Sequence, residues 1–258
     1  MLQLTQLSVR LTGQTVLHGL DLASGPQGSI TCLLGPNGCG KSTLLRTLAG
    51  QLAYGGSIRH ASQPDWQHRY GTLPAKVAWL PQDCGSNSRL SAVEVVLLGK
   101  LQTLGWRVPA QLQQQARQQL AQLGLSAVAQ QPLCQLSGGQ RQMVFLAQAL
   151  MREPSILLLD EPISALDLQH QQQVLALIEQ QTRQRNMLTI MVLHDLNAAR
   201  RYSQHCWLLQ QGRVLVAGAT AEVMTPALLS QLYHTPISSI TADDGFALFY
   251  HGRHAQPA

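Results

Sequence analysis

The chain has 258 residues, of which 45% are hydrophobic and 12% charged, and its formal net charge is +5. This apolar content is enough for the packed core of one large or two small domains, so the composition excludes disordered and fibrous proteins. The positive balance is compatible with nucleic acid, nucleotide phosphates or an anionic membrane surface as partners and does not choose among them.

The sequence indicates neither a membrane span nor a cysteine framework. Apolar runs such as residues 156–159 stop well short of the roughly eighteen residues that a spanning helix needs. Residues 1–6 lack the basic start and the apolar stretch of a signal peptide, so we expect the protein to stay in the compartment where it is made. The five cysteines are scattered and form no CxxC pair, which predicts reduced thiols rather than disulfides or a zinc site.

The first third of the chain predicts two strands, a glycine-rich turn and a helix. Residues 2–9 alternate apolar and polar side chains as a half-buried strand does, and residues 29–34 form a short β-rich run. Leucines at helical spacing predict a helix over residues 41–52. The sequence is irregular from residue 57 until a strand-like run at residues 76–80.

A phosphate-binding loop lies between the second strand and the helix. The residues from Gly35 to Ser42 fit the pattern GxxxxGK[ST] in the strand–turn–helix context that its chemistry requires. Backbone amides of such a loop surround phosphate oxygens, Lys41 is expected to reach the β and γ phosphates, and Ser42 is expected to ligate Mg²⁺. The predicted nucleotide-binding residues are Gly35, Pro36, Asn37, Gly38, Cys39, Gly40, Lys41, Ser42 and Thr43.

The middle of the chain predicts helices only. Residues 110–123 form a glutamine-rich amphipathic pattern, and residues 138–152 predict a helix that ends before Pro154. This break in the strand pattern indicates a helical subdomain inserted into an α/β core. The expected organisation is one domain over residues 1–258, with its core at about 1–83 and 154–258 and the helical subdomain at about 84–153.

Beyond this section strands and helices alternate, as in a parallel sheet with crossover helices. Strands are predicted at 155–159, 188–193, 213–217 and 246–250, and helices at 168–183, from 195 onward and from about 226. The first of these strands delivers Asp160 and Glu161 at its carboxyl end, where open α/β sheets hold their ligands. Asp160 suits a Mg²⁺ shell, and Glu161 is placed to polarise a water that attacks a γ-phosphate.

The sequence Leu-Ser-Gly-Gly-Gln at residues 136–140 resembles, together with the phosphate loop and the acidic strand end, the signature of ATP-binding-cassette ATPases. The resemblance covers nearly the whole chain, because Gln82 is similar to the family's Q-loop, His194 to its switch histidine and residues 164–167 to its D-loop. It implies an α/β fold: a P-loop NTPase cassette with a parallel-sheet core, an antiparallel β subdomain and an inserted α-helical subdomain. The signature residues are Leu136, Ser137, Gly138, Gly139 and Gln140, and the D-loop residues are Ser164, Ala165, Leu166 and Asp167.

The resemblance also implies ATP hydrolysis in a head-to-tail dimer of two copies of the chain. Backbone amides at the start of the predicted signature helix form a second anion site, which would close over an ATP held on the phosphate loop of the other subunit. ATP and Mg²⁺ are the implied cofactors. The implied catalytic residues are Glu161, His194 and Gln82, and the implied metal ligands are Ser42, Gln82 and Asp160.

A cassette without a membrane span needs a membrane partner. The stretch at residues 192–203 and His170 resemble the ATPase subunits of bacterial iron–siderophore, haem and cobalamin importers, whereas Ile163 stands where threonine is common. Zinc, manganese and molybdate importers share much of this sequence and stay as alternatives. The implied partners besides the second copy are a permease dimer and a periplasmic or surface substrate-binding protein, with the chain peripheral at the cytoplasmic face of the bacterial inner membrane.

A cassette ATPase acting on nucleic acid is the alternative from a different class, and the isoelectric point near 9.2 is its best support. DNA-repair cassettes carry long coiled-coil insertions and ribosomal ones carry two cassettes, and this sequence has neither feature. A nucleotide kinase or GTPase would leave residues 136–140 without a purpose. We therefore expect no nucleic-acid partner.

Two stretches leave their interpretation open. Cassette ATPases usually stack adenine on an aromatic residue near the end of the first strand, where this chain has Leu11; Leu11 or Val16 offers an apolar face instead, and Arg10 a guanidinium plane. Apolar side chains between Asp83 and Trp106 line either a groove for a permease helix or the core of the helical subdomain. These side chains are Leu90, Val93, Val96, Leu97 and Trp106.

Overall fold

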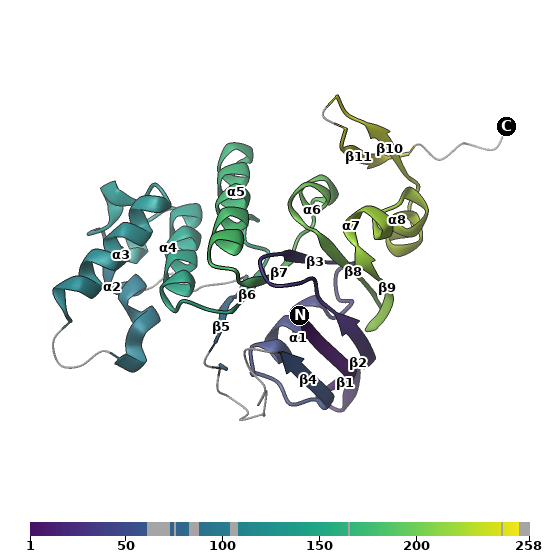
Figure 1. Cartoon of the computed structure of the whole chain (residues 1–258), viewed down its shortest axis with the longest axis horizontal. Coiled ribbons are helices and arrows are strands. Elements are labelled where there is room, and N and C mark those ends of the chain that lie inside the picture. Colours follow the sequence, from purple (N-terminus) through teal and green to yellow (C-terminus); the bar gives the residue numbers. More distant parts are fainter. Residues whose placement is uncertain are drawn as a thin grey trace.

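A six-stranded sheet runs through the middle of the molecule (Figure 1). The computed structural model describes residues 1–60, 73–74, 76–82, 88–103, 108–164, 166–243 and 245–252. The strand order is β5-β6-β7-β3-β8-β9, in which β9 is antiparallel to β8 and all other neighbours are parallel. The strands are β3 (Ile30–Leu34), β5 (Val77–Leu80), β6 (Ile156–Asp160), β7 (Leu188–Val192), β8 (His205–Gln210) and β9 (Arg213–Ala219).

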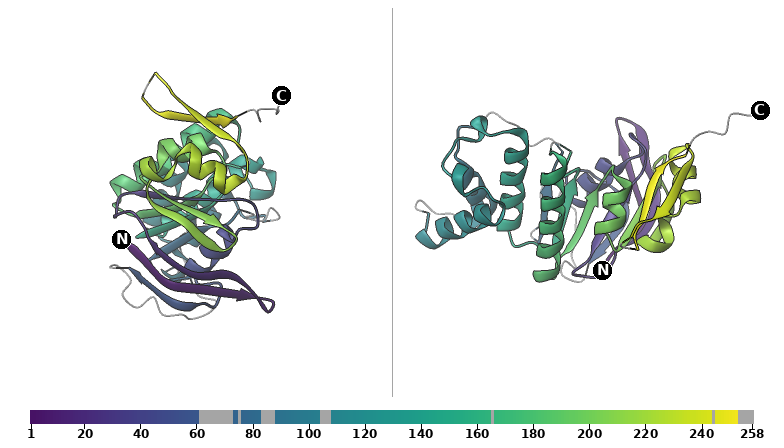
Figure 2. Two further views of the ribbon diagram at one scale, coloured as in Figure 1. Left: turned by 90° about the vertical axis from the view of Figure 1, so that its right-hand side faces the viewer. Right: turned by 90° about the horizontal axis from the view of Figure 1, so that it is seen from above.

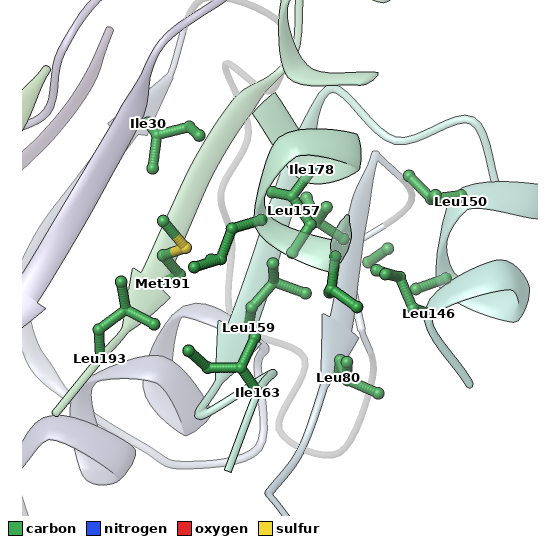
Figure 3. Packing of buried hydrophobic residues seen from close by; sticks show 14 of the residues in the cluster. Ile30, Leu80, Leu146, Leu150, Leu157, Leu159, Ile163, Ile178, Met191 and Leu193 are labelled. Atoms are coloured by element: carbon green, nitrogen blue, oxygen red, sulfur yellow. The ribbon is translucent and has the colours of Figure 1, made fainter. Parts of the chain in front are cut away.

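The central strands β3, β6 and β7 are buried along their whole length, as expected of parallel strands that are covered on both faces. Ile190 and Val192 of β7 pack toward α1, whereas Met191 packs toward α5. Figure 3 shows Met191, together with Leu157 and Leu159 of β6, on the side of the sheet that packs against Ile178 of α5. The helices that flank the sheet are α1 (Lys41–Leu48), α5 (Leu168–Gln184), α6 (Leu196–Tyr202), α7 (Thr220–Val223) and α8 (Pro226–Tyr233).

A second, antiparallel sheet of three strands lies beside α1. Its order is β2-β1-β4, built from β1 (Leu2–Leu11), β2 (Gln14–Ala23) and β4 (Gly55–His60). The sequence predicts β1 but neither β2 nor β4, and the irregular conformation expected after residue 56 is wrong for residues 57–60. β4 opens with two glycines and buries only two side chains, so its register depends on long-range pairs such as Leu2 with His60.

Two more differences from the prediction have local causes. Helix α1 ends at Leu48 rather than at residue 52, because Gly50 takes a φ of 75° and donates to the Thr47 carbonyl at 2.9 Å, as glycines do at helix ends. Leu52 is nevertheless buried beyond the helix end. The sequence predicts a helix from residue 195 with no defined end and therefore misses strand β8. In the structure this helix ends at Tyr202, and β8 follows it.

The helices between β5 and β6 lie at one end of the molecule (Figure 2). Val93, Val96 and Leu97 are buried among them, so these three form the core of the helical section, and Leu90 is exposed. Asp83 and Trp106 lie outside the described residues, and the boundaries near residues 84 and 153 stay a prediction. The elements are α2 (Ala92–Leu97), α3 (Ala110–Gln122), α4 (Gly138–Met151) and three short 3-10 helices at Leu98–Thr103, Ser126–Val128 and Leu133–Gln135.

A β-hairpin of β10 (Ile237–Thr241) and β11 (Ala247–His251) projects from the body at the end opposite the helical section (Figures 1 and 2). A mixed sheet core, an antiparallel sheet and a helical section together match the predicted fold class. Within the described ranges, every helix is too short or too polar to cross a lipid bilayer. Cys32, Cys39, Cys134 and Cys206 are free thiols, as expected, and Cys84 lies outside the described residues.

Candidate nucleotide site

The predicted phosphate loop joins β3 to α1 at the carboxyl edge of the large sheet. Gly40 opens α1 with a φ of 107°, and a Cβ there would lie 2.7 Å from the Leu17 side chain, so only glycine fits. The turn between β8 and β9 holds the loop from behind, because Gly212 N donates to Cys39 O at 3.0 Å and His18 N donates to Gly212 O at 2.9 Å. Residues far apart in the sequence therefore fix the shape of the loop.

The ammonium group of Lys41 lies inside the loop. Its Nζ donates to the carbonyls of Gly35 at 2.6 Å and Pro36 at 2.9 Å, and the residue is 6% exposed. A buried cation among backbone groups at a helix N-terminus is a strong attraction for an anion. The geometry fits the predicted role of Lys41 as a phosphate ligand.

Asp160 lies beneath the loop at the carboxyl end of β6 and is 3% exposed. The Ser42 hydroxyl hydrogen-bonds to its carboxyl group, whose Oδ1 has no partner within the described part of the chain. Burial raises the pKa of Asp160, with the Ser42 hydrogen bond opposing the rise and the charge of Glu161 adding to it. A buried carboxylate oxygen without a partner beside a serine hydroxyl is a donor set that suits Mg²⁺.

Glu161 lies between the two other predicted catalytic residues. Its Oε2 accepts a hydrogen bond from Gln82 Nε2 at 2.8 Å, and its Oε1 lies 2.5 Å from His194 Nε2. The Glu161 backbone has a φ of 53°, a left-handed conformation that is strained for a residue with a side chain. Three residues from three separate segments thus meet at the end of the sheet, although 79 residues separate Gln82 from Glu161.

Gln142 is a site residue that the motifs do not indicate. It is buried in α4, and its Nε2 donates to the Glu161 carbonyl at 3.0 Å. Ser164 Oγ donates to the same carbonyl at 3.1 Å. The available sequence signal was a glutamine two positions after the signature, on the helix face that turns toward the core.

The signature residues open helix α4. Ser137 and Gln140 form a capping box, in which Gln140 N donates to Ser137 Oγ at 3.2 Å and Ser137 N donates to Gln140 Oε1 at 3.0 Å. Leu136 is buried, while Ser137 and Gly138 are exposed, so the start of the helix is open to solvent. The signature lines a cleft of about 750 Å³ that the phosphate loop does not line.

The D-loop, residues 164–167, connects the surroundings of Glu161 with the signature cleft. Ser164 binds the Glu161 carbonyl, Asp167 caps α5 through a 2.9 Å hydrogen bond from His170 N, and Leu166 and Asp167 line the signature cleft. Ala165 lies outside the described residues. The predicted site residues therefore form two groups, the loop with the acidic strand end and the signature, joined by the D-loop and Gln142.

A phosphate loop after the buried strand β3, with paired carboxylates at the end of β6 of the same sheet and only β7 between the two strands, defines a P-loop nucleotide hydrolase. The family follows from comparison with known proteins. Residues 18–164 match the family model described as ABC transporter. The chain belongs to this family, as the motifs predicted, and it is an ATPase.

Relatives at more than 30% identity cover nearly the whole chain. It is 34% identical over 239 residues to the iron(3+)-hydroxamate import ATP-binding protein FhuC of Bacillus subtilis, with 92% of this chain and 88% of that protein covered. It is 37% identical over 257 residues to the hemin import ATP-binding protein HmuV of Shewanella denitrificans, with 95% and 97% covered. A solved metal-chelate type ABC transporter in an inward-facing conformation is 28% identical, with a TM-score of 0.83 over 98% of both chains.

Residues 10–18, which surround Leu11 at the end of β1, contain no phenylalanine, tyrosine or tryptophan. Leu11 and Val16 are half-buried, and the Val16 carbonyl lies next to Gly40 of the phosphate loop. Arg10 Nη2 donates to Gly13 O at 3.1 Å, so its guanidinium is held in the β1–β2 turn. The two aliphatic side chains are therefore better placed than Arg10 to contact a base.

We expect Leu11→Tyr to lower the Michaelis constant for ATP by about threefold or more, because an aromatic ring stacks on a base more strongly than leucine does. Steady-state ATPase kinetics measures this. Thr15→Tyr places the same ring on the opposite face of the β1–β2 pair, since Thr15 is exposed and pairs with Arg10, and it should leave the constant unchanged. An unchanged or raised constant for Leu11→Tyr would contradict the base contact.

We expect Asp160→Asn to abolish ATPase activity and yet to raise the Tm of the nucleotide-free protein at pH 7 by a few degrees. Burial raises the pKa of Asp160 in the folded protein above its ordinary value of about 3.9. The protonated carboxyl therefore favours the folded state at low pH, and this contribution is lost as the pH rises through the raised pKa. The gain should shrink as the pH falls toward that value.

Thermal unfolding followed by circular dichroism across this pH range tests the claim. Asp243→Asn removes the same charge from the exposed turn of the hairpin and should leave Tm unchanged. A lowered Tm for Asp160→Asn at pH 7 would mean that the Asp160 carboxylate stabilises the resting protein.

Proposed function

We propose that this chain is the ATP-hydrolysing subunit of a bacterial ABC importer that takes up an iron chelate, either a siderophore or haem, or cobalamin through a separate permease. The observation that carries the catalytic part is the contact of Glu161 with both Gln82 and His194 beside the buried Asp160. The import part is supported by the relatives, whose names assign them to iron-hydroxamate and hemin import.

The phosphates of ATP bind residues 35–43. Lys41 already donates to two loop carbonyls and can turn one or more of its N–H bonds to phosphate oxygens without leaving the loop. Glu161 accepts a proton from the attacking water and acts as the general base. Each oxygen of Glu161 has one contact in the resting structure and can accept a further hydrogen bond, so the water can reach the carboxylate beside Gln82 and His194.

Mg²⁺ would be held by Ser42, Asp160 and Gln82. When bound, it neutralises charge on the β and γ phosphates and orients them for in-line transfer. The Asp160 carboxylate then gains the partner that its Oδ1 lacks among the described residues. His194 contacts the γ-phosphate, and its other contact with Glu161 links loss of that phosphate to the general base.

Two copies of the chain close head to tail over two ATP molecules. The exposed amides at the start of α4 supply the second phosphate contact, because they lie apart from the phosphate loop of their own chain. ATP binding favours the closed pair and hydrolysis releases it, which makes the dimer a ligand-driven two-state switch.

The remaining partners are a permease dimer in the inner membrane and a periplasmic or surface substrate-binding protein. The chain binds the permease from the cytoplasmic face, with Gln82 linking the γ-phosphate to the permease-facing surface of the helical section. Co-expression with a permease encoded beside this gene, followed by ATP-driven uptake of iron chelates, haem and cobalamin into vesicles, tests the assignment. Uptake of free zinc, manganese or molybdate in place of these compounds would overturn it.

Glu161→Gln should lower ATP turnover by about 10²–10⁴-fold, because the amide cannot accept the proton from water. The same variant should accumulate as an ATP-bound dimer, which sedimentation velocity detects. Glu179→Gln is the matched control, because Glu179 forms an ion pair with Arg183 on α5. This variant should leave ATP turnover and the monomer–dimer equilibrium unchanged. A Glu161→Gln protein that stays monomeric with ATP would contradict the two-ATP dimer.

A further inference from the structure

Exposed apolar side chains gather near the C-terminal hairpin. Of the eight large hydrophobic residues that are exposed in the described part of the chain, five lie on this hairpin or at the start of α5. Single exposed apolar residues are normal on a protein surface, but a cluster of this kind marks an interaction site. The five, here called the hairpin surface, are Leu168, Ile240, Phe246, Leu248 and Tyr250.

The hairpin is anchored on α6 through Phe249. Phe249 is buried, and Asn197 of α6 clamps its backbone, with Phe249 N donating to Asn197 Oδ1 at 2.7 Å and Asn197 Nδ2 donating to Phe249 O at 3.2 Å. On the opposite face, Ile240 pairs directly with Leu248 across the strands, and Tyr250 lies two residues further along. Their exposed fractions are 56%, 39% and 50%. A two-stranded hairpin is marginal by itself, so this one depends on its contacts with α6, which leave Ile240, Leu248 and Tyr250 exposed.

The hairpin surface continues into the D-loop region. A cleft of about 360 Å³ is lined by Leu168 of α5, the arginines of α6 and residues 246–248 of the hairpin. Leu168 follows Asp167 of the D-loop directly and is 69% exposed. Arg200 and Arg201 hold the Phe246 ring at 5.9 and 5.6 Å, which fixes the turn of the hairpin over this cleft.

The position of the hairpin surface beside the D-loop identifies its binding partner, given the proposed head-to-tail dimer. In a two-fold dimer each phosphate loop meets the signature of the other copy, so the axis passes between the two motifs of one chain. The D-loop lies at that place, because it binds the Glu161 carbonyl on one side and lines the signature cleft on the other. Leu168 is therefore near the axis, and the hairpin surface that extends from it faces the second copy.

We propose that the hairpin surface docks on a second copy of this chain and extends the ATP-bound dimer beyond its nucleotide contacts. This inference rests on the proposed function. The helical section, where the permease is expected to bind, lies at the other end of the molecule (Figure 1). The hairpin therefore serves the pairing of the two ATPase subunits rather than the membrane contact.

The test uses the full chain with Glu161→Gln, ATP and Mg²⁺, and measures the dimer dissociation constant by sedimentation velocity. Ile240→Lys with Leu248→Glu replaces the apolar pair by opposite charges across the strands, so the pairing of the hairpin is kept. We expect this double variant to raise the dissociation constant by about tenfold, which is about 1.4 kcal/mol. Tyr250→Ser should weaken the dimer in the same direction and to a smaller extent.

Leu101→Lys is the matched control, because Leu101 is 62% exposed on the helical section. It should leave the dissociation constant unchanged, and equal weakening by this control would overturn the inference. A dimer as tight in the double variant and in Tyr250→Ser as in the parent would also overturn it, as would loss of permease assembly with an intact dimer. Failure of the parent Glu161→Gln chain to dimerise would instead refute the proposed two-ATP dimer.

Discussion

Two adjacent carboxylates at the end of β6 differ in burial and in hydrogen-bond partners, and the rest of the site depends on that difference. Asp160 is buried with one oxygen unpartnered in the described structure, whereas Glu161 is partly exposed and contacts a glutamine and a histidine. A single residue step at the strand end therefore gives one buried carboxylate that suits a cation and one carboxylate that contacts side chains from two other strand ends. The left-handed backbone of Glu161 produces the turn between them.

The packing of the sheet fixes the position of Asp160 and Glu161 at the end of β6. β6 lies in the sheet between β5 and β7, and all of its residues are buried. Gln82 follows β5 and His194 follows β7, so the parallel register brings both beside Glu161. Parallel strands deliver their carboxyl ends to one edge, which is why residues from three distant segments form one group. Their convergence follows from the topology of the sheet and needs no local motif.

Much of this arrangement was predictable because the phosphate loop, the acidic pair and His194 each follow a continuous apolar strand. Glu161 and Lys41 lie where their flanking strand and helix placed them. The missed elements lack such a signal. β4 has two glycines and few buried side chains, and its pairing with β1 comes from a tertiary contact that no local pattern contains. Gln142 was missed for a similar reason, since a buried glutamine in a glutamine-rich chain is recognised only by the carbonyl that it meets.

The Gln142 contact has a mechanical consequence for the ATPase cycle. It joins the helix that begins with the signature to the carbonyl of the general base, and Ser164 of the D-loop donates to the same oxygen. In the proposed dimer, a displacement of α4 when the signature meets a nucleotide on the other copy would act directly on the strained backbone of Glu161. Because the side chain of Glu161 also contacts Gln82 and His194, that displacement alters both contacts together. Under the proposed mechanism, closure of the dimer and placement of Glu161 as the base would be one event, since both depend on the same few hydrogen bonds.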